Sequence, residues 1–318
     1  MPRKAPNSVR PKASSASANA APNYLTKMGR AYCADAIDVL RRLPDASVSL
    51  ALTSPPFALR RQKAYGNVAA NEYVDWFLPF ADQIHRILKP DGSFVMELGS
   101  AWNPGSGTRS LYQYQLLLRL AEHFHLAQDF YWYNPCKLPT PAEWVTIRRT
   151  RVKDAVSIIW WLSKTTEPQA DNRRVLVPYS RSMRRLLKDG YKAAMRPSQH
   201  EIGPHFQRDN GGAIPPNLLT IPNTRSNDEY LHACRAAGVT IHPARFPPGL
   251  PEFFIRFLTE PGQTVLDPFA GSNVTGRAAE TLGRRWISVE INEDYIAGSR
   301  LRFGELAVSS SQPDSAAG

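Results

Sequence analysis

Several features are scarce or missing in this 318-residue sequence. It holds only three cysteines, Cys33, Cys136 and Cys234, which lie far apart and show no metal-ligand spacing. A disulfide scaffold and a structural zinc site are therefore not expected. No apolar run approaches the ~20 residues of a membrane span, and the N-terminus lacks the apolar core of a secretory signal. We expect a cytoplasmic protein without metal or membrane partner.

Two common phosphate-binding signatures are also missing. The sequence has no Gly-Lys-Ser/Thr ending of a P-loop and no G-x-G-x-x-G dinucleotide fingerprint. A nucleotide-like ligand would have to be held by another kind of loop.

What the sequence does have is an excess of positive charge, +11 overall, concentrated in two segments. Residues 1–30 carry six basic and no acidic residues, and residues 137–200 carry fourteen against five, which leaves −4 for the rest. One strongly basic stretch on a slightly acidic body indicates a single anion-facing surface, although a solvated face would look the same.

The composition also suggests boundaries along the chain. Residues 1–23 form a basic tail rich in Pro, Ser and Ala, and residues 309–318 are similar, so both are expected to be disordered. From about residue 165 to 240 the apolar pattern weakens and Pro, Gly, Asn and Arg accumulate. This region is predicted to be an irregular, surface-rich insertion.

Short apolar runs alternate with amphipathic stretches, which predicts an α/β fold with a mostly parallel sheet. The four clearest strand candidates form its centre: 48–53, 93–98, 264–268 and 286–291. Helical spacing predicts a helix over residues 74–88, ended by Lys89-Pro-Asp-Gly92, and another over 272–282, closed by Gly283.

One predicted strand runs into the glycine-containing turn Asp267-Pro268-Phe269-Ala270-Gly271-Ser272-Asn273 and then a helix. Ligands of open α/β sheets bind where strands end, because small residues there let the ligand approach the backbone. Glu290 ends the next strand, where an acid can hydrogen-bond both hydroxyls of a ribose. Together these features predict an adenosine-sized site, although a glycine turn alone is also common in ordinary connections.

A second motif, Thr53-Ser54-Pro55-Pro56-Phe57, directly follows the first strand. Two prolines have fixed φ and no N–H, so they form a stiff loop whose carbonyl oxygens can accept hydrogen bonds. Such acceptors suit an exocyclic base amine, whose lone pair is delocalised into the ring. Ser54 Oγ and a proline carbonyl would draw that nitrogen towards a tetrahedral geometry, with Phe57 stacking on the base.

In this order and at strand ends, the two motifs resemble those of the β-class amino-methyltransferases of restriction-modification systems. The resemblance spans about residues 32–302 and includes the strings TSPPFAL, EYVDWF, LKPDGSFV, RVKDAV, DNGG, IPPNLL, HPARFP and LPEFFIR. It implies a Rossmann-like methyltransferase fold with a seven-stranded sheet, circularly permuted so that the catalytic half (24–164) precedes the target-recognition region (165–240) and the cofactor half (241–308). Serine before Pro-Pro favours cytosine N4 over adenine N6.

The resemblance also implies a cofactor and partners. S-adenosylmethionine would donate the methyl group and leave as S-adenosylhomocysteine, with no metal. The substrate would be double-stranded DNA with a palindromic target such as CAGCTG and an extruded base. A cognate restriction endonuclease sharing that target would form no stable complex, and the enzyme would be a monomer or homodimer in the bacterial cytoplasm at the nucleoid.

Site residues carry over from the resemblance by position. The catalytic set is Ser54, Pro55, Pro56, Phe57 and Glu97, where Glu97 replaces a family aspartate proposed to relay a proton with the serine. The cofactor set, with Asp35 at the adenine, Glu290 at the ribose and the 242–248 segment over the methionine part, is Asp35, Thr53, Pro243, Phe246, Asp267, Pro268, Phe269, Gly271, Ser272, Asn273 and Glu290.

Basic and polar residues of residues 137–210 are candidates for DNA contacts. We expect phosphate contacts from Arg148, Arg149, Arg151, Lys153, Arg181 and Arg185. Base-edge readers are expected among Arg196, His200, Arg208, Asp209 and Asn210. The aromatic run 130–133 suits a cage for the extruded base, but such a run is more often part of a core.

Two other interpretations remain open. One is a methyltransferase of adenine N6 or of RNA with the same fold. The other is a basic DNA-binding protein that retains a catalytically inactive α/β core, which would show no methyl transfer and no dependence on Ser54.

Overall fold

The computed structural model describes residues 21–58, 68–190, 208–223 and 229–309. Their strands form one sheet in the order β10-β1-β2-β9-β8-β3-β4-β6-β5-β7. The strands are β1 Tyr24–Leu25, β2 Gly29–Cys33, β3 Val48–Thr53, β4 Leu88–Leu98, β5 His125–Tyr133, β6 Val156–Ser163, β7 Leu218–Thr220, β8 Thr264–Asp267, β9 Arg285–Glu290 and β10 Val308–Ser309.

The four predicted strands are β3, β4, β8 and β9, and they lie side by side at the centre of this sheet. Neighbouring pairs from β2 through β9, β8 and β3 to β4 are all parallel, whereas β6 is antiparallel to both β4 and β5. The sheet is therefore mixed. The described residues form ten strands rather than the expected seven, because β1, β10 and β7 add two- and three-residue strands at the edges.

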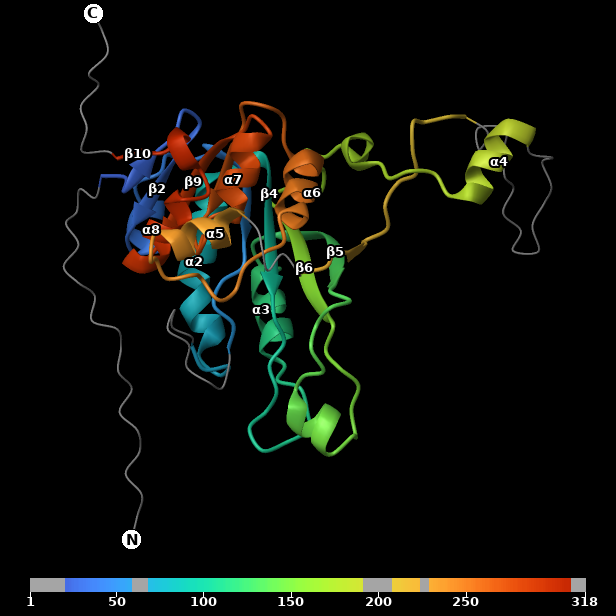
Figure 1. The fold of residues 1–318 in the computed structure, drawn as a ribbon, viewed down its shortest axis with the longest axis horizontal. Helices are drawn as coiled ribbons and strands as arrows, with labels where there is room; N and C mark the ends of the chain where they lie inside the picture. The colour runs from blue at the N-terminus through green and yellow to red at the C-terminus, as the bar shows by residue number, and fades with distance from the viewer. Residues whose placement is uncertain (1–20, 59–67, 191–207, 224–228, 310–318) are drawn as a thin grey trace, which may run out of the picture.

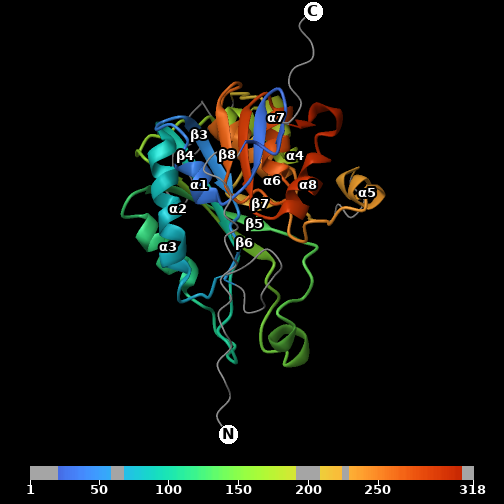
Figure 2. The same ribbon diagram turned by 90° about the vertical axis from the view of Figure 1, so that its left-hand side faces the viewer.

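Helices cover both faces of the sheet, as Figures 1 and 2 show. They are α1 Ala36–Leu40, α2 Tyr73–Ile87, α3 Tyr112–Leu120, α4 Arg181–Asp189, α5 Glu229–Ala236, α6 Gly249–Leu258, α7 Val274–Thr281 and α8 Glu293–Arg300. Apolar side chains of α1, α2 and α3 form one core layer, and those of α6, α7 and α8 form the other. Burying one apolar stripe per helix on each face stabilises this three-layer arrangement.

Both helix predictions are confirmed, with different ends. Helix α2 stops at Ile87, but residues 88–92 continue directly as the first part of β4 rather than as a turn. Helix α7 begins at Val274, capped by Asn273, and Gly283 follows it with φ of +72°.

The region 165–240 is less irregular than expected. Its described part contains α4, α5, β7 and a 3-10 turn at Asn172–Val175. That turn packs against the body, since Arg174 Nη1 donates to Thr259 O (3.0 Å), while the segment carrying α4 projects far from the sheet (Figure 1).

The aromatic run of β5 belongs mainly to the core. Phe130 and Trp132 are buried, and Phe130 packs its ring against Phe254 of α6 with 5.1 Å between ring centroids. Tyr131 points to the opposite face and is exposed. The alternation along a strand explains this, since successive side chains point to opposite faces.

Candidate active site

The two sequence motifs meet at the carboxyl edge of the sheet, where neighbouring strands β3 and β8 end in Thr53 and Asp267. Thr53 Oγ1 donates to Asp267 Oδ1 (2.7 Å), and both side chains are buried. Burial raises the pKa of Asp267 from 3.8 to about 6, although the Thr53 hydroxyl favours the ionised form. The hydrogen bond joins the predicted catalytic motif to the predicted cofactor motif.

Ser54 and Glu97 form a second hydrogen-bonded pair at the same edge. Ser54 Oγ donates to Glu97 Oε2 (2.6 Å), and Glu97 is buried near the end of β4, the neighbour of β3. Desolvation raises the pKa of Glu97, and the Ser54 hydroxyl opposes that rise. The glutamate therefore reaches the serine despite its extra methylene.

The Pro-Pro-Phe loop is held by residues that sequence reasoning missed. The Tyr73 hydroxyl at the start of α2 donates to Pro56 O (2.8 Å). Gly99 lies against the half-buried Phe57 ring so closely that a Cβ there would be 2.3 Å from a ring carbon. Tyr73 falls within the EYVDWF string, but only the three-dimensional contact reveals what it does.

The turn after β8 forms a narrow cradle around Gly271. Gly271 has φ of +52°, and its N–H donates to Glu290 Oε2 (2.8 Å) at the end of β9. A Cβ at Gly271 would lie 3.0 Å from the His242 ring, so a larger residue would crowd the turn. Asn292 N–H donates to the other oxygen of Glu290 (2.9 Å), and burial raises the pKa of this acid.

Two further predicted cofactor residues flank this cradle. Asp35 is exposed just after β2, where Cys33 pairs with Glu290 of β9, and Asp35 Oδ1 accepts from Ile37 N (2.8 Å) to cap α1. Phe269 is half-buried and packs on α2, 5.0 Å from the Phe80 ring centroid. Pro268 is buried within the turn.

The structure assigns other tasks to two predicted cofactor side chains. Asn273 is fully buried in the left-handed conformation, and its Oδ1 accepts from Gly276 N and Ser288 Oγ (3.0 and 2.7 Å) while its Nδ2 donates to Tyr24. Its side chain caps α7. Ser272 is also buried, with its Oγ accepting from Arg302 Nη2 (3.0 Å).

In the 242–248 segment, the residue next to Gly271 is His242, whereas the residues predicted from the sequence are Pro243 and Phe246. His242 packs edge-on against Tyr295 at 4.5 Å between ring centroids, and burial lowers its pKa to about 4, so its ring is neutral at pH 7. Pro243 is exposed. Phe246 packs against the other core layer, 6.5 Å from the Trp132 ring centroid.

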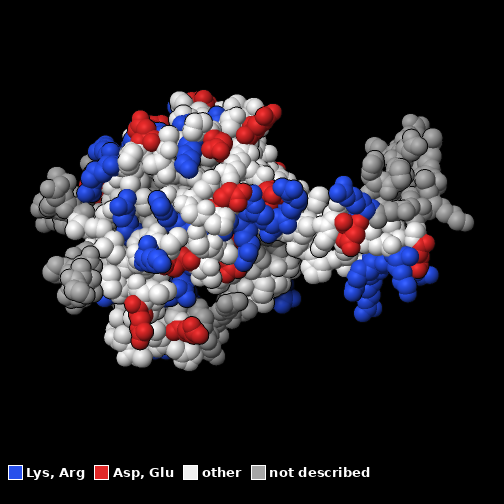
Figure 3. Space-filling model, turned by 90° about the horizontal axis from the view of Figure 1, so that it is seen from above, with Lys and Arg blue, Asp and Glu red and all other residues white. Residues whose placement is uncertain are grey.

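The predicted DNA-contacting residues occupy two separate places. Residues 134–155 form a hairpin arm between β5 and β6, and this arm carries Arg148, Arg149, Arg151 and Lys153. Lys and Arg side chains also gather on the projecting segment around α4 (Figure 3), which includes Arg181 and Arg185. Arg208, Asp209 and Asn210 are exposed beyond α4. Arg196 and His200 lie outside the described residues.

Two basic side chains of the arm and one of α4 are held by contacts within the protein. Arg148 pairs with Glu143 (2.7 Å) and lies over the Trp144 ring at 4.6 Å, and Lys153 Nζ donates to Lys137 O (3.2 Å). On α4, Arg185 pairs with Asp189 (3.3 Å).

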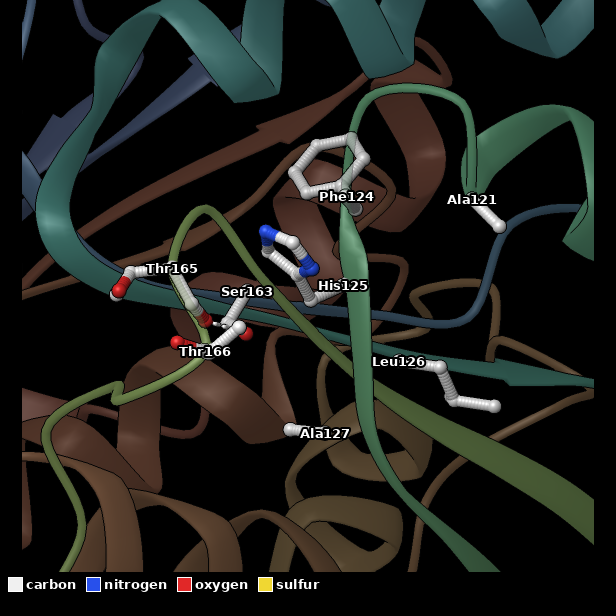
Figure 4. Close-up of a pocket in the computed structure, with 8 residues that line it drawn as sticks. All are labelled: Ala121, Phe124, His125, Leu126, Ala127, Ser163, Thr165 and Thr166. Carbon is white, nitrogen blue, oxygen red and sulfur yellow. Dashed lines mark hydrogen bonds between the residues drawn. The ribbon is translucent and has the colours of Figure 1, made fainter.

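A separate hollow of about 430 Å³ lies away from these residues (Figure 4). Its lining includes His125 at the start of β5 and Ser163 at the end of β6, and Ser163 pairs with Ser93 near the amino end of the β4 core. It is therefore at the opposite edge of the sheet from Ser54. Within the described ranges no three His, Cys, Asp or Glu residues cluster as a metal site, and no helix is long and apolar enough to cross a membrane.

Comparison with known proteins places the chain in a family. The family described as "DNA methylase" matches residues 48–300. The type II methyltransferase M.PvuII of Proteus hauseri is 52% identical over 287 residues, which cover 89% of this chain and 85% of that protein. M.BglII of Bacillus subtilis is 26% identical, covering 85% and 67%.

Solved structures of DNA methyltransferases resemble this fold as well. The PvuII DNA methyltransferase (cytosine-N4-specific) superimposes with a TM-score of 0.73 at 45% identity, covering 92% of this chain and 90% of that one. A DNA modification methylase of Thermus thermophilus, solved with S-adenosyl-L-methionine, has a TM-score of 0.53 at 22% identity over 86% and 91%, which shows a shared fold. The chain belongs to the DNA methylase family and is a homologue of a type II, cytosine-N4-specific DNA methyltransferase.

Proposed function

We propose that this chain transfers a methyl group from S-adenosylmethionine to the exocyclic N4 amine of a cytosine in duplex DNA. The observation that carries the proposal is the hydrogen-bonded pair Ser54–Glu97 beside the linked residues Thr53 and Asp267, all at one sheet edge. The relative that is 52% identical, and whose structure is titled cytosine-N4-specific, supports the choice of base.

The cradle around Gly271 fits the cofactor. Glu290 is buried yet keeps acceptor capacity for ribose hydroxyls, since each of its oxygens accepts one backbone N–H. Asp35 would meet the adenine, Phe269 and Gly271 would line the pocket, and Asp267 would face the positively charged end. When bound, S-adenosylmethionine supplies an electrophilic methyl group and leaves as S-adenosylhomocysteine. No metal is required.

The arrangement also matches a circularly permuted methyltransferase order. The strand that carries the catalytic motif, β3, precedes the cofactor strand β8 in the chain, although they are neighbours in the sheet. We assign residues 24–164 to the catalytic half, 241–308 to the cofactor half, and 165–240 to target recognition.

Residues of the Ser-Pro-Pro-Phe loop would bind and orient the amine. Ser54 Oγ and Pro55 O would accept its two N–H groups, while Pro56 O accepts from Tyr73 and so holds the loop. Phe57, held by Gly99, would stack on the cytosine ring. Fixing the nitrogen in this way supplies much of the rate enhancement expected of a positioned displacement.

Glu97 would remove the surplus proton. Methylation leaves the amine nitrogen with one proton too many, which passes to Ser54 Oγ while the Ser54 hydroxyl proton passes to Glu97 along the 2.6 Å hydrogen bond. The raised pKa makes Glu97 a better proton acceptor than an ordinary carboxylate.

The cytosine must leave the helix to reach this edge, at a cost of a few kcal/mol. Basic side chains of the hairpin arm and of α4 would hold the phosphates and compensate part of that cost. Binding should therefore weaken steeply with salt.

The test is direct. The purified protein is incubated with S-adenosylmethionine and plasmid DNA containing CAGCTG, and the nucleosides are separated after digestion. We expect N4-methylcytosine, and we expect Ser54→Ala to abolish it while the protein stays folded. N6-methyladenine alone would refute the assignment to cytosine N4, and no methylated nucleoside would refute the enzyme.

A further inference from the structure

The hairpin arm leaves the sheet beside the catalytic residues. In the strand register, Ile158 pairs with Leu98, the neighbour of Glu97, and the pair Tyr133–Val156 at the base of the arm lies two residues further along. Figure 1 shows it projecting beyond the sheet with a short helical turn, Glu143–Ile147, near its tip. The arm thus stands at the edge where the target base would enter.

Apolar side chains on this arm point into solvent. Leu138, Ile147 and Val152 are 75%, 69% and 87% exposed, and Val152 has the highest exposure of the large apolar side chains in the described ranges. In the free protein these aliphatic side chains stay largely in solvent and gain little from burial. Because all three belong to one projecting segment, the arm is a candidate surface for contact with a partner.

The charge around these side chains indicates which partner. Both acids of the arm are paired, Glu143 with Arg148 and Asp154 with Arg109. Arg149, Arg151 and Lys153 form no ion pair with a described acid. Cations flanking bare aliphatic groups match a duplex, whose phosphates are anionic and whose stacked bases are apolar.

The arm is braced rather than loose. Asp154 accepts from Trp102 Nε1 (2.9 Å) and from Arg109, whose guanidinium lies over the Trp102 ring at 4.7 Å. Arg151 Nε donates to Gly107 O (3.3 Å). These contacts tie the arm to residues 99–111, the segment that follows the Glu97 strand, so it holds a fixed position relative to the catalytic residues.

We propose that the hairpin arm is a wedge: Ile147 and Val152 enter the base stack beside the target cytosine, and Arg149 and Arg151 hold the flanking phosphates. Filling the opened stack with aliphatic groups compensates the lost base stacking, so that the cytosine rotates towards Ser54. The inference rests on the proposed function and adds to it the means of opening the duplex.

The test compares two substrates. One is a duplex with the target cytosine paired to guanine, and the other places an abasic site opposite the same cytosine, so that less work is needed to extrude it. The double variant Ile147→Ser/Val152→Ser should lose about tenfold in kcat/KM on the paired duplex and little on the abasic one. Leu118→Ser, which changes a residue 71% exposed on α3, is the matched control and should leave both rates unchanged.

A phosphate contact has a different signature. Arg149→Ala, which leaves the bracing contact of Arg151 in place, should weaken binding to both duplexes alike and reduce the salt dependence. An equal loss on both substrates with the serine variant, or no loss, would overturn the wedge. A change from dimer to monomer in that variant, together with equal losses, would instead make the arm an interface between copies.

A second readout separates this inference from the proposed function. 2-Aminopurine placed next to the target brightens when the stack opens, so its fluorescence on binding reports opening of the duplex even without methyl transfer. The wild type should brighten it and the serine variant should not. If the wild type binds and brightens the probe but transfers no methyl group, the proposed function fails and the wedge stands.

Discussion

Replacing Asp267 by asparagine should make the ligand-free protein relatively more stable as the pH rises. Asp267 is buried, and its pKa is raised from 3.8 to about 6, which corresponds to ~3 kcal/mol of unfavourable free energy for the ionised form in the folded state. Asparagine keeps the shape, and its Oδ1 still accepts from Thr53 Oγ1 and Phe269 N. It removes the buried charge.

The sign follows from proton linkage. A carboxyl with a raised pKa binds its proton more tightly when folded, so its contribution to stability is greatest at low pH and is lost as the pH rises from about 4 to about 6. The difference in unfolding free energy between Asp267→Asn and the wild type should therefore grow over this interval by about 2–3 kcal/mol and then stay level. Any unsatisfied amide N–H adds a constant cost at every pH.

Urea unfolding at pH 4, 5, 6, 7 and 8 measures this difference. Asp38→Asn, which removes an exposed carboxylate from α1, is the matched control for the loss of one negative charge. A difference between Asp267→Asn and the wild type that does not vary with pH, or that shrinks towards pH 8, would refute the reasoning.

The remaining predictions concern the catalytic loop. Glu97→Gln should lower kcat by about 10²-fold or more, because the amide cannot accept the proton from Ser54. In the wild type, kcat should fall as the pH is lowered, and the fall should begin above the usual pKa range of a carboxyl group. The reason is that burial raises the Glu97 pKa and only the ionised form accepts a proton. Near-normal turnover in Glu97→Gln would contradict the proton relay. Gly99→Ala should lower kcat/KM by about tenfold and cost about 1–3 kcal/mol of stability, because the added Cβ displaces the Phe57 ring. Methylation assays and thermal melting check this, and wild-type activity would show that Phe57 tolerates the shift.

The sequence predicted the parts of the site that depend on local order. The short apolar runs that end in Thr53, Asp267 and Glu290 predict strands, and parallel strands place such ends at one edge of the sheet. The central strands and the order of the two motifs followed from the same pattern. The three short edge strands did not, since two or three residues carry too little periodicity.

Other site features depend on contacts between segments that are distant in the sequence. His242 lies against Gly271, Tyr73 donates to Pro56, and Gly99 lies against the Phe57 ring. No spacing of residues along the chain predicts these contacts. The resemblance places Asn273 in the cofactor set, and the structure adds that its left-handed backbone turns the side chain inward to cap α7. The direction of a side chain at such a turn depends on the φ of its own residue, and the sequence alone does not predict that angle.

Three buried acids at this edge link stability to ligand charge. Asp267 and Glu290 end the neighbouring strands β8 and β9, Glu97 lies near the end of β4, and desolvation raises the pKa of each. Asp267 also raises the pKa of Glu290, because like charges oppose joint ionisation. A cluster of this kind costs folding free energy, and a bound cation relieves that cost. We infer that a ligand with a sulfonium and an ammonium group would stabilise the fold most above pH 6, where Asp267 is ionised and the unrelieved repulsion is greatest.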